Sequence, residues 1–226
     1  MRTSLVACGF ALATVLPAAA QVAPSAAEAA AYSGLHAAAW KGDAAKIEKL
    51  AAASNVNARD AHGRTPLHVA TFAKQHAAIR ALVKAGADLS LLENDRYDAV
   101  TIASVANDEE TLRLLLSLGA SAKLVTSRYD GTALIAAAHL GHAGVVQQLI
   151  KAGAPLDHVN NLHWTALIES IVLGDGGPRH VQTLKALVDA GASTQLADRA
   201  GNTPLRLAKS RGYREMAQIL EAKGAR

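Results

Sequence analysis

Apolar residues along the chain fall into short segments whose spacing is that of one helical face. The clearest are residues 111–116 (TLRLLL) and 145–150 (VVQQLI), where apolar positions recur at the period of an α-helix. A Gly-Ala pair closely follows each segment, and a glycine at that place ends a helix in the left-handed conformation. The pattern predicts a series of short amphipathic helices.

The helix-ending pairs recur at an almost constant spacing. Successive glycines of these pairs lie 33, 34, 38 and 33 residues apart, and a small residue near the start of each unit recurs with a similar period. Internal repeats of this length are typical of solenoids, so the sequence predicts six units. The pairs begin at Gly86, Gly119, Gly153, Gly191 and Gly224, and the small residues are Ala38, Ala70, Ala103, Ala137, Ser170 and Ala208.

Each unit opens with a residue able to cap a helix. Such side chains accept a hydrogen bond from a free amide at the helix start, and Pro66 and Pro204 take the first helical position, where proline costs no hydrogen bond. Each unit therefore contains two helices. Because so small a pair cannot bury its own apolar face, neighbouring units must stack. The capping residues are Ser33, Thr65, Asp98, Thr132, Thr165 and Thr203.

Two stretches carry a family resemblance. Residues 60–70 (DAHGRTPLHVA) and 86–89 (GADL) resemble the ankyrin-repeat consensus, and the resemblance extends over residues 33–226. It implies an all-α solenoid of about six helix-turn-helix units, joined by β-hairpin or loop connections, with a protein-binding groove and no catalytic residues. The unit at Asp98 departs most from the pattern, which questions its local rigidity. The units span approximately 33–59, 60–92, 93–126, 127–159, 160–197 and 198–226.

The N-terminus reads as a signal peptide, residues 1–20. Arg2 precedes an apolar run at residues 5–16, and Ala18-Ala19-Ala20 offers a cleavage site after Ala20. The apolar run is too short to span a membrane, which takes about 20 residues. We therefore expect a periplasmic or secreted bacterial protein without a stable membrane anchor, in which residues 21–32 form an alanine-rich linker.

The composition of the mature chain argues against thiol chemistry and against nucleic-acid binding. Cleavage removes Cys8, the single cysteine, and lowers the net charge from +4 to +3, so neither disulfides nor thiol chemistry are expected. The small excess of basic residues is scattered along the chain, whereas a nucleic-acid protein clusters its cations. We expect a monomer that binds a protein and no nucleic acid.

The resemblance also indicates which positions face the groove. Five of the seven aromatic residues in the mature chain fall on these positions, and aromatic side chains supply much of the binding energy of interfaces. The alternative is that several of these rings pack between hairpins. The groove positions are Trp40, Lys41, His62, Arg64, Phe72, Tyr97, Arg128, Tyr129, His139, Leu140, Leu162, Trp164, Val172, Leu173, Arg199, Asn202 and Arg211.

Glu169 occupies a position that is apolar in the other units. A buried carboxylate needs a partner or a shifted pKa, and Arg179 and His180 follow in an insertion at residues 174–180. A structural Glu169–Arg179 pair is one interpretation. The alternative function is a small-molecule or metal-binding protein that uses Glu169, Arg179 and His180.

The sequence indicates no zinc site, no phosphate-binding loop and no catalytic site. The histidines of residues 158–163 fit no zinc pattern, and we expect His68 and His36 to brace Thr65 and Ser33. Residues 174–177 are rich in glycine but lack the lysine of a phosphate loop, and no nucleophile elbow or paired-carboxylate site is present. The sequence thus favours a non-enzymatic scaffold of the cell envelope that needs no cofactor. Similarity to periplasmic ankyrin proteins suggests a role in stress protection or toxin immunity.

Overall fold

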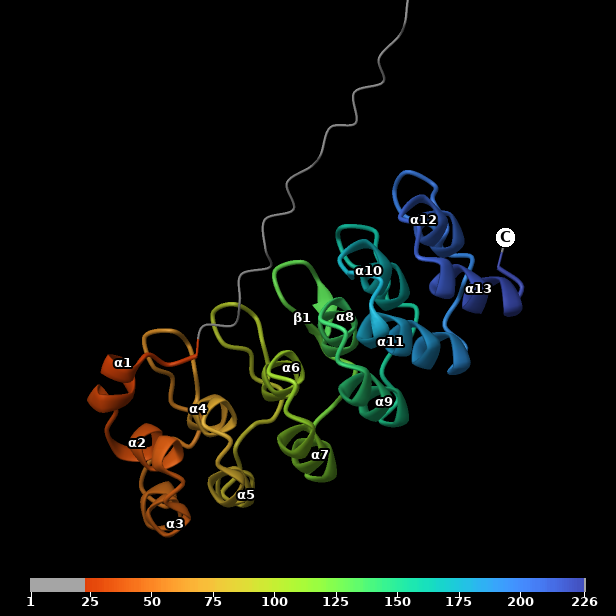
Figure 1. Ribbon diagram of the computed structural model, residues 1–226. Helices are drawn as coiled ribbons and strands as arrows, with labels where there is room; N and C mark the ends of the chain where they lie inside the picture. Colours follow the sequence, from red (N-terminus) through yellow and green to blue (C-terminus); the bar gives the residue numbers. More distant parts are fainter. Residues whose placement is uncertain (1–22, 226) are drawn as a thin grey trace, which may run out of the picture.

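The computed structural model describes residues 23–225. The expected signal peptide, its cleavage site and Cys8 lie outside these residues. The described chain is a curved row of helix pairs that runs from the orange to the blue end in Figure 1, as the repeat predicts.

Six helix pairs form the row, and the connections between them turn back on themselves as hairpins, for example where the Asp60 amide donates to the carbonyl oxygen of Arg64. Helix α1 precedes the first pair, and strands β1 and β2 form an antiparallel hairpin before α8, with Val125 opposite Thr132. This confirms the all-α solenoid of six helix-turn-helix units. The elements are α1 (Ala26–Ala31); α2 (Gly34–Lys41) with α3 (Ala44–Ala51); α4 (Pro66–Phe72) with α5 (His76–Lys84); α6 (Ala99–Val105) with α7 (Glu109–Ser117); β1 (Val125–Thr126) and β2 (Gly131–Thr132); α8 (Ala133–His139) with α9 (Ala143–Lys151); α10 (Ala166–Val172) with α11 (Pro178–Asp189); and α12 (Pro204–Ser210) with α13 (Arg214–Ala222).

The expected capping residues stand at the start of the first helix of each pair. The side chains of Thr65, Asp98 and Thr132 accept a hydrogen bond from the amide three residues on, as do those of Thr165 and Thr203. Ser33 has the N-cap position without this bond. The glycines of the Gly-Ala pairs have positive φ, for example 89° at Gly86 and 96° at Gly119, so the helix ends were also predicted correctly.

Stacking produces one continuous core. First helices pack on first helices (α2, α4, α6, α8, α10, α12), and second helices on second helices (α3, α5, α7, α9, α11, α13). The small residue predicted near the start of each unit is buried in every case; Ala70, Ala137 and Ser170 have no exposed surface. These residues let neighbouring helices approach closely.

The segment expected as a linker, residues 21–32, is in part a helix. Helix α1 covers Ala26–Ala31, and its Glu28 Oε1 accepts a hydrogen bond from Arg64 Nη2 at 2.5 Å. Arg64 Nε in turn lies 2.7 Å from Asp60 Oδ2. The described end of this segment therefore covers the first hairpin, and alanine-rich composition alone could not show that.

Replacing Ala137 by leucine should destabilise the fold. Ala137 has no exposed surface, so the added atoms would push α8 against its neighbours, which costs about 1–3 kcal/mol. Urea denaturation measures the loss, with Ala77→Leu at an exposed position of α5 as the control. Equal stability of the two variants would contradict close helix packing at Ala137.

Candidate functional site

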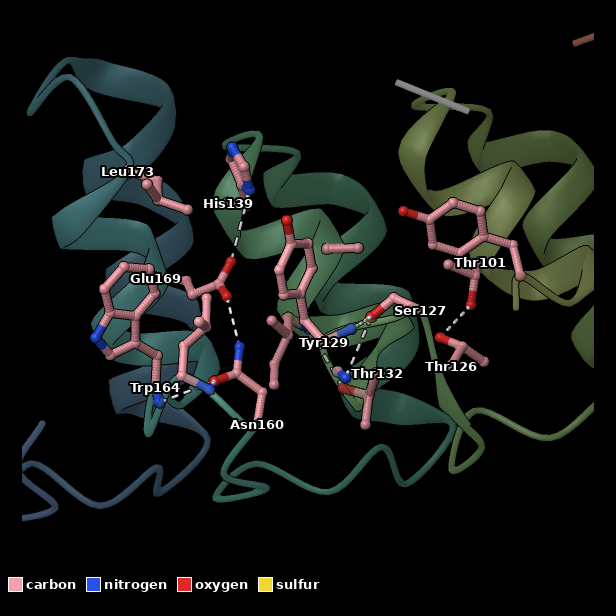
Figure 2. Close-up of a pocket in the computed structure, with 15 residues that line it drawn as sticks. Thr101, Thr126, Ser127, Tyr129, Thr132, His139, Asn160, Trp164, Glu169 and Leu173 are labelled. Carbon is pink, nitrogen blue, oxygen red and sulfur yellow. Dashed lines mark hydrogen bonds and ion pairs between the residues drawn. The ribbon is translucent and has the colours of Figure 1, made fainter. Parts of the chain in front are cut away.

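A cavity of about 310 Å³ opens between the third, fourth and fifth units. The hairpins that precede α6, α8 and α10, and the first helices themselves, contribute its lining. Tyr97, Tyr129, Trp164 and Leu173 supply much of its apolar wall, and Glu169 and His139 supply its ionisable groups. Figure 2 shows the Glu169 carboxyl between the side chains of Tyr129 and Trp164.

A second depression, of about 350 Å³, lies between α3 and α5. Its lining consists of alanines together with Glu48 and Lys84, whose charged ends pair at 3.1 Å in exposed positions. It offers no aromatic ring and no buried polar group, so the cavity beside Glu169 is the better candidate site.

Local turn geometry positions the cavity wall. Asn160 Oδ1 accepts hydrogen bonds from the amides of Leu162 and Trp164, both at 3.0 Å. Ser127 Oγ does the same for Tyr129 and Gly131 one unit earlier, both at 3.3 Å. The side chain that opens each turn therefore fixes the backbone from which the rings of Tyr129 and Trp164 project.

Glu169 is buried, with 5% of its surface exposed. Asn160 Nδ2 donates a hydrogen bond to its Oε1 at 2.8 Å, and His139 Nδ1 lies 3.6 Å from its Oε2. Burial raises the pKa of Glu169 to about 7, although the hydrogen bond from Asn160 opposes this. A carboxyl in this position is part protonated at neutral pH.

The imidazole beside it is neutral under the same conditions. Burial lowers the pKa of His139, and the neighbouring His180 and His142 lower it further by repulsion between positive charges. The contact between His139 and Glu169 is thus between a carboxyl group and an uncharged ring, rather than a full ion pair.

Asn160 is the site residue that sequence reasoning missed. Asp60 and Asp198 occupy the same turn position in other units and accept the same pair of amide hydrogen bonds. An aspartate there would repel Glu169, whereas an amide keeps the acceptor and adds a donor. The sequence could have indicated this residue, because Asn160 stands in place of an aspartate at this turn position in the same unit that carries Glu169.

The comparisons identify the fold family. A family model described as ankyrin repeats (3 copies) matches residues 35–126, 101–198 and 134–226. The ankyrin repeat protein YahD of Escherichia coli K12 is 35% identical over 190 residues, which is 83% of this chain and 94% of that protein. The chain belongs to the ankyrin-repeat family.

Solved ankyrin structures agree with this. An ankyrin repeat domain from Acinetobacter baumannii AYE is 42% identical, with a TM-score of 0.79, and the match covers 85% of this chain and 98% of that one. Another solved ankyrin repeat protein is 30% identical, with a TM-score of 0.74 and coverage of 84% and 98%. The matching family is a protein-interaction fold, and no catalytic family is indicated.

Six of the groove residues expected from the ankyrin pattern line the cavity, namely Tyr97, Tyr129, His139, Leu162, Trp164 and Leu173. The others lie elsewhere on the solenoid: Trp40 is partly buried against the core, Phe72 is half-buried, and Lys41, His62 and Arg128 are exposed.

Arg64 corrects the groove prediction. Its exposed fraction is 1%, because Glu28 and Asp60 bind its guanidinium from two sides. A groove position in the ankyrin pattern is exposed only when nothing covers its hairpin, and here α1 covers it. The exposed Arg128, in contrast, pairs with Asp95 of the preceding hairpin.

The expected Glu169–Arg179 pair is also wrong. Arg179 is exposed at the start of α11, while Glu169 contacts Asn160 and His139. His180 is buried, with Nδ1 2.8 Å from Asp175 Oδ1 and Nε2 2.9 Å from the carbonyl oxygen of His139. His180 therefore attaches the insertion to the solenoid, and Arg179 does not contribute to this attachment.

Histidines join successive ankyrin units. His68 braces Thr65 as expected, at 3.0 Å, and its Nε2 reaches the carbonyl oxygen of Leu91 in the next hairpin. His36 contacts the carbonyl oxygen of Arg64 at 2.9 Å, and no capping bond to Ser33 forms. His158 reaches the carbonyl oxygen of Asp130 in the same way, so the histidine content has a structural explanation.

The described residues offer neither a metal-binding cluster nor a membrane-spanning helix. Residues 23–225 contain no group of three or more His, Cys, Asp or Glu side chains that could hold a metal ion. Within the same part of the chain, no helix is both long and apolar enough to cross a membrane.

Replacing Glu169 by glutamine should stabilise the protein at alkaline pH. The folded protein holds a proton on Glu169 up to about pH 7, so its stability falls as pH rises from about 4.5 to 7, where the unfolded chain binds fewer protons. Glutamine keeps the acceptor for Asn160 and carries no charge. We expect a gain of about 2–3 kcal/mol in unfolding free energy at pH 8 and little change at pH 4.5.

Denaturation by urea at several pH values measures this difference. Glu110→Gln is the matched control, because the Glu110 side chain is 75% exposed on α7 and its substitution should give no comparable pH-dependent difference. A Glu169→Gln variant less stable than the parent at pH 8 would show that the carboxylate is a stabilising partner.

Proposed function

We propose that this ankyrin-repeat protein is a non-enzymatic scaffold that binds a protein partner at the cavity and the adjoining hairpins. The observation that carries the proposal is the convergence of Tyr97, Tyr129 and Trp164, from three successive units, on one open cavity. Aromatic side chains in pockets contribute most of the energy of typical interfaces.

The surface around the cavity supports a protein partner. Five large apolar residues of the described chain are exposed, all in the connections between helix pairs, and two of them, Tyr129 and Leu162, line the cavity. Arg96 Nη1 lies 3.1 Å from Asp130 Oδ1, and Arg128 pairs with Asp95, so charged pairs hold adjacent hairpins together. The apolar residues are Val125, Tyr129, Val159, Leu162 and Leu196.

A non-enzymatic role is favoured by how the cavity's hydroxyl groups are used. Ser127 Oγ accepts hydrogen bonds from its own turn, and Thr132 caps α8. Thr101 and Thr126 hydroxyls lie 3.0 Å apart and bond each other. None of these contacts prepares a nucleophile against a base, which covalent catalysis requires. The alternative site at Glu169, Arg179 and His180 loses support, because Arg179 points to solvent and His180 is engaged by the insertion.

We also propose that the scaffold works in the bacterial cell envelope, as a periplasmic or secreted monomer. Residues 1–20 have the organisation of a signal peptide, and the residues that follow contain no cysteine, which suits an oxidising compartment. Stress protection or toxin immunity is the biological setting we propose, since both need only a surface that holds another protein.

Export is testable with a reporter. Alkaline phosphatase without its own signal, fused after residue 25, should become active in the periplasm because residues 1–20 direct its export. The matched control lacks residues 5–16, the apolar run. An inactive fusion, or equal activity of the control, would contradict export by this segment.

Replacing Tyr129 or Trp164 by alanine should weaken partner binding by about 1–4 kcal/mol, the range for residues at the centre of an interface. The partner is first identified by photo-crosslinking from Leu162, which is 37% exposed beside the cavity. Binding of that partner is then measured by calorimetry, and thermal melting shows whether each variant keeps its stability.

Trp40→Ala is the matched control, because Trp40 packs on the core away from the cavity. It should lower the melting temperature and leave affinity unchanged. An affinity loss equal to that of Trp164→Ala would mean that binding is not centred on the cavity.

A further inference from the structure

We propose that the cavity receives the side chain of a lysine from the protein partner, with the ammonium on Glu169 and the methylene chain between the rings of Tyr129 and Trp164. The inference rests on the proposed function and names the group that the partner inserts.

Size and shape suit a single long side chain. A volume of about 310 Å³ is at the lower end of ligand pockets, about 300–1,000 Å³. In Figure 2 the Glu169 carboxyl lies between Tyr129 and Trp164, with His139 and Asn160 on its two other sides. Aromatic rings favour both an aliphatic stem and a cation above their faces.

Charge complementarity indicates a cation. Among the described residues, the groups that contact the Glu169 carboxyl are the Asn160 amide and the His139 ring. The nearby cations of the rim are used elsewhere, Arg128 by Asp95 and Arg96 by Asp130. A buried carboxylate without a positive partner is costly, and an incoming cation removes that cost.

The hydrogen bonds favour an ammonium over a guanidinium. Asn160 occupies Oε1 of Glu169, which leaves Oε2 as the acceptor facing His139 at 3.6 Å. A guanidinium binds best to both oxygens of a carboxylate. An ammonium is a point charge with three donors, so it can donate to Oε2 and to the nearby Nδ1 of a neutral His139 together.

Binding then displaces a proton, because the ammonium needs the carboxylate form. Few other ionisable groups lie on the helices around Glu169. Helix α8 carries His139, and α11 carries His180, whose Nδ1 bonds Asp175. Helix α12 carries Arg206 and Lys209, both exposed, and Lys209 pairs with Glu221 at 2.6 Å. Since burial holds the pKa of Glu169 near 7, affinity should rise about tenfold from pH 6 to pH 8 and then level off.

The probe is lysine blocked at both ends, N-acetyl-lysine N-methylamide. NMR follows the indole signal of Trp164, assigned with the Trp40→Phe variant, while matched sodium chloride corrects for ionic strength. We expect saturable binding with a Kd on the order of millimolar. Acetylation of the probe's side-chain nitrogen should weaken binding at least about tenfold, because the charge is lost, and blocked arginine should bind more weakly than blocked lysine.

Two variants make the test specific. Glu169→Gln should keep the fold and lose about tenfold in affinity together with the pH dependence, whereas Glu110→Gln should change neither. Equal binding of the acetylated probe, stronger binding of blocked arginine, or no saturable shift up to about 50 mM probe would overturn the proposal. If the crosslinked partner depends on Tyr129 and Trp164 but not on Glu169, the scaffold function stands and the lysine assignment falls.

Discussion

The fold depends on one constraint: no helix pair of this chain can bury its apolar face without a neighbour. The helices are short, seven residues in α4, α6, α8, α10 and α12, and helices of this length are unstable alone. Buried small residues such as Ala70 and Ala137 allow the close contact that compensates. Histidine bonds to the carbonyl groups of adjacent units add a polar connection. The result is a rigid series of hairpins at regular spacing.

That regularity explains how a cavity can form from residues about 30 positions apart in the sequence. Tyr97 and Trp164 stand directly before the capping residues of their units, and Tyr129 stands three residues before Thr132. Stacking brings these similar positions of successive units next to each other in space. Turn acceptors such as Ser127 and Asn160 then fix the backbone at each hairpin. A surface of this kind is assembled by the repeat itself.

Sequence reasoning succeeded where structure is decided locally. Capping residues and small buried positions repeat in every unit, and Gly-Ala pairs in five of the six, so six helix pairs could be predicted from them. It failed where two distant segments meet: Arg64 is buried because Glu28 from α1 reaches it, and Glu169 contacts Asn160 and His139 in place of Arg179. Such contacts depend on the angle between helices and hairpins, which a periodic pattern does not encode.

The chemistry of the site arises where the repeat is broken. Val69 and Ile102 occupy the position of Glu169 in other units and are buried, so an acid there costs stability unless its charge is suppressed or compensated. Asn160, placed where Asp60 and Asp198 stand, supplies one hydrogen bond but no charge. A carboxyl with a pKa near 7 can remain neutral in the free protein and become ionised when a cation arrives. The same departure from the repeat can therefore be tolerated by the fold and still provide specificity for a partner.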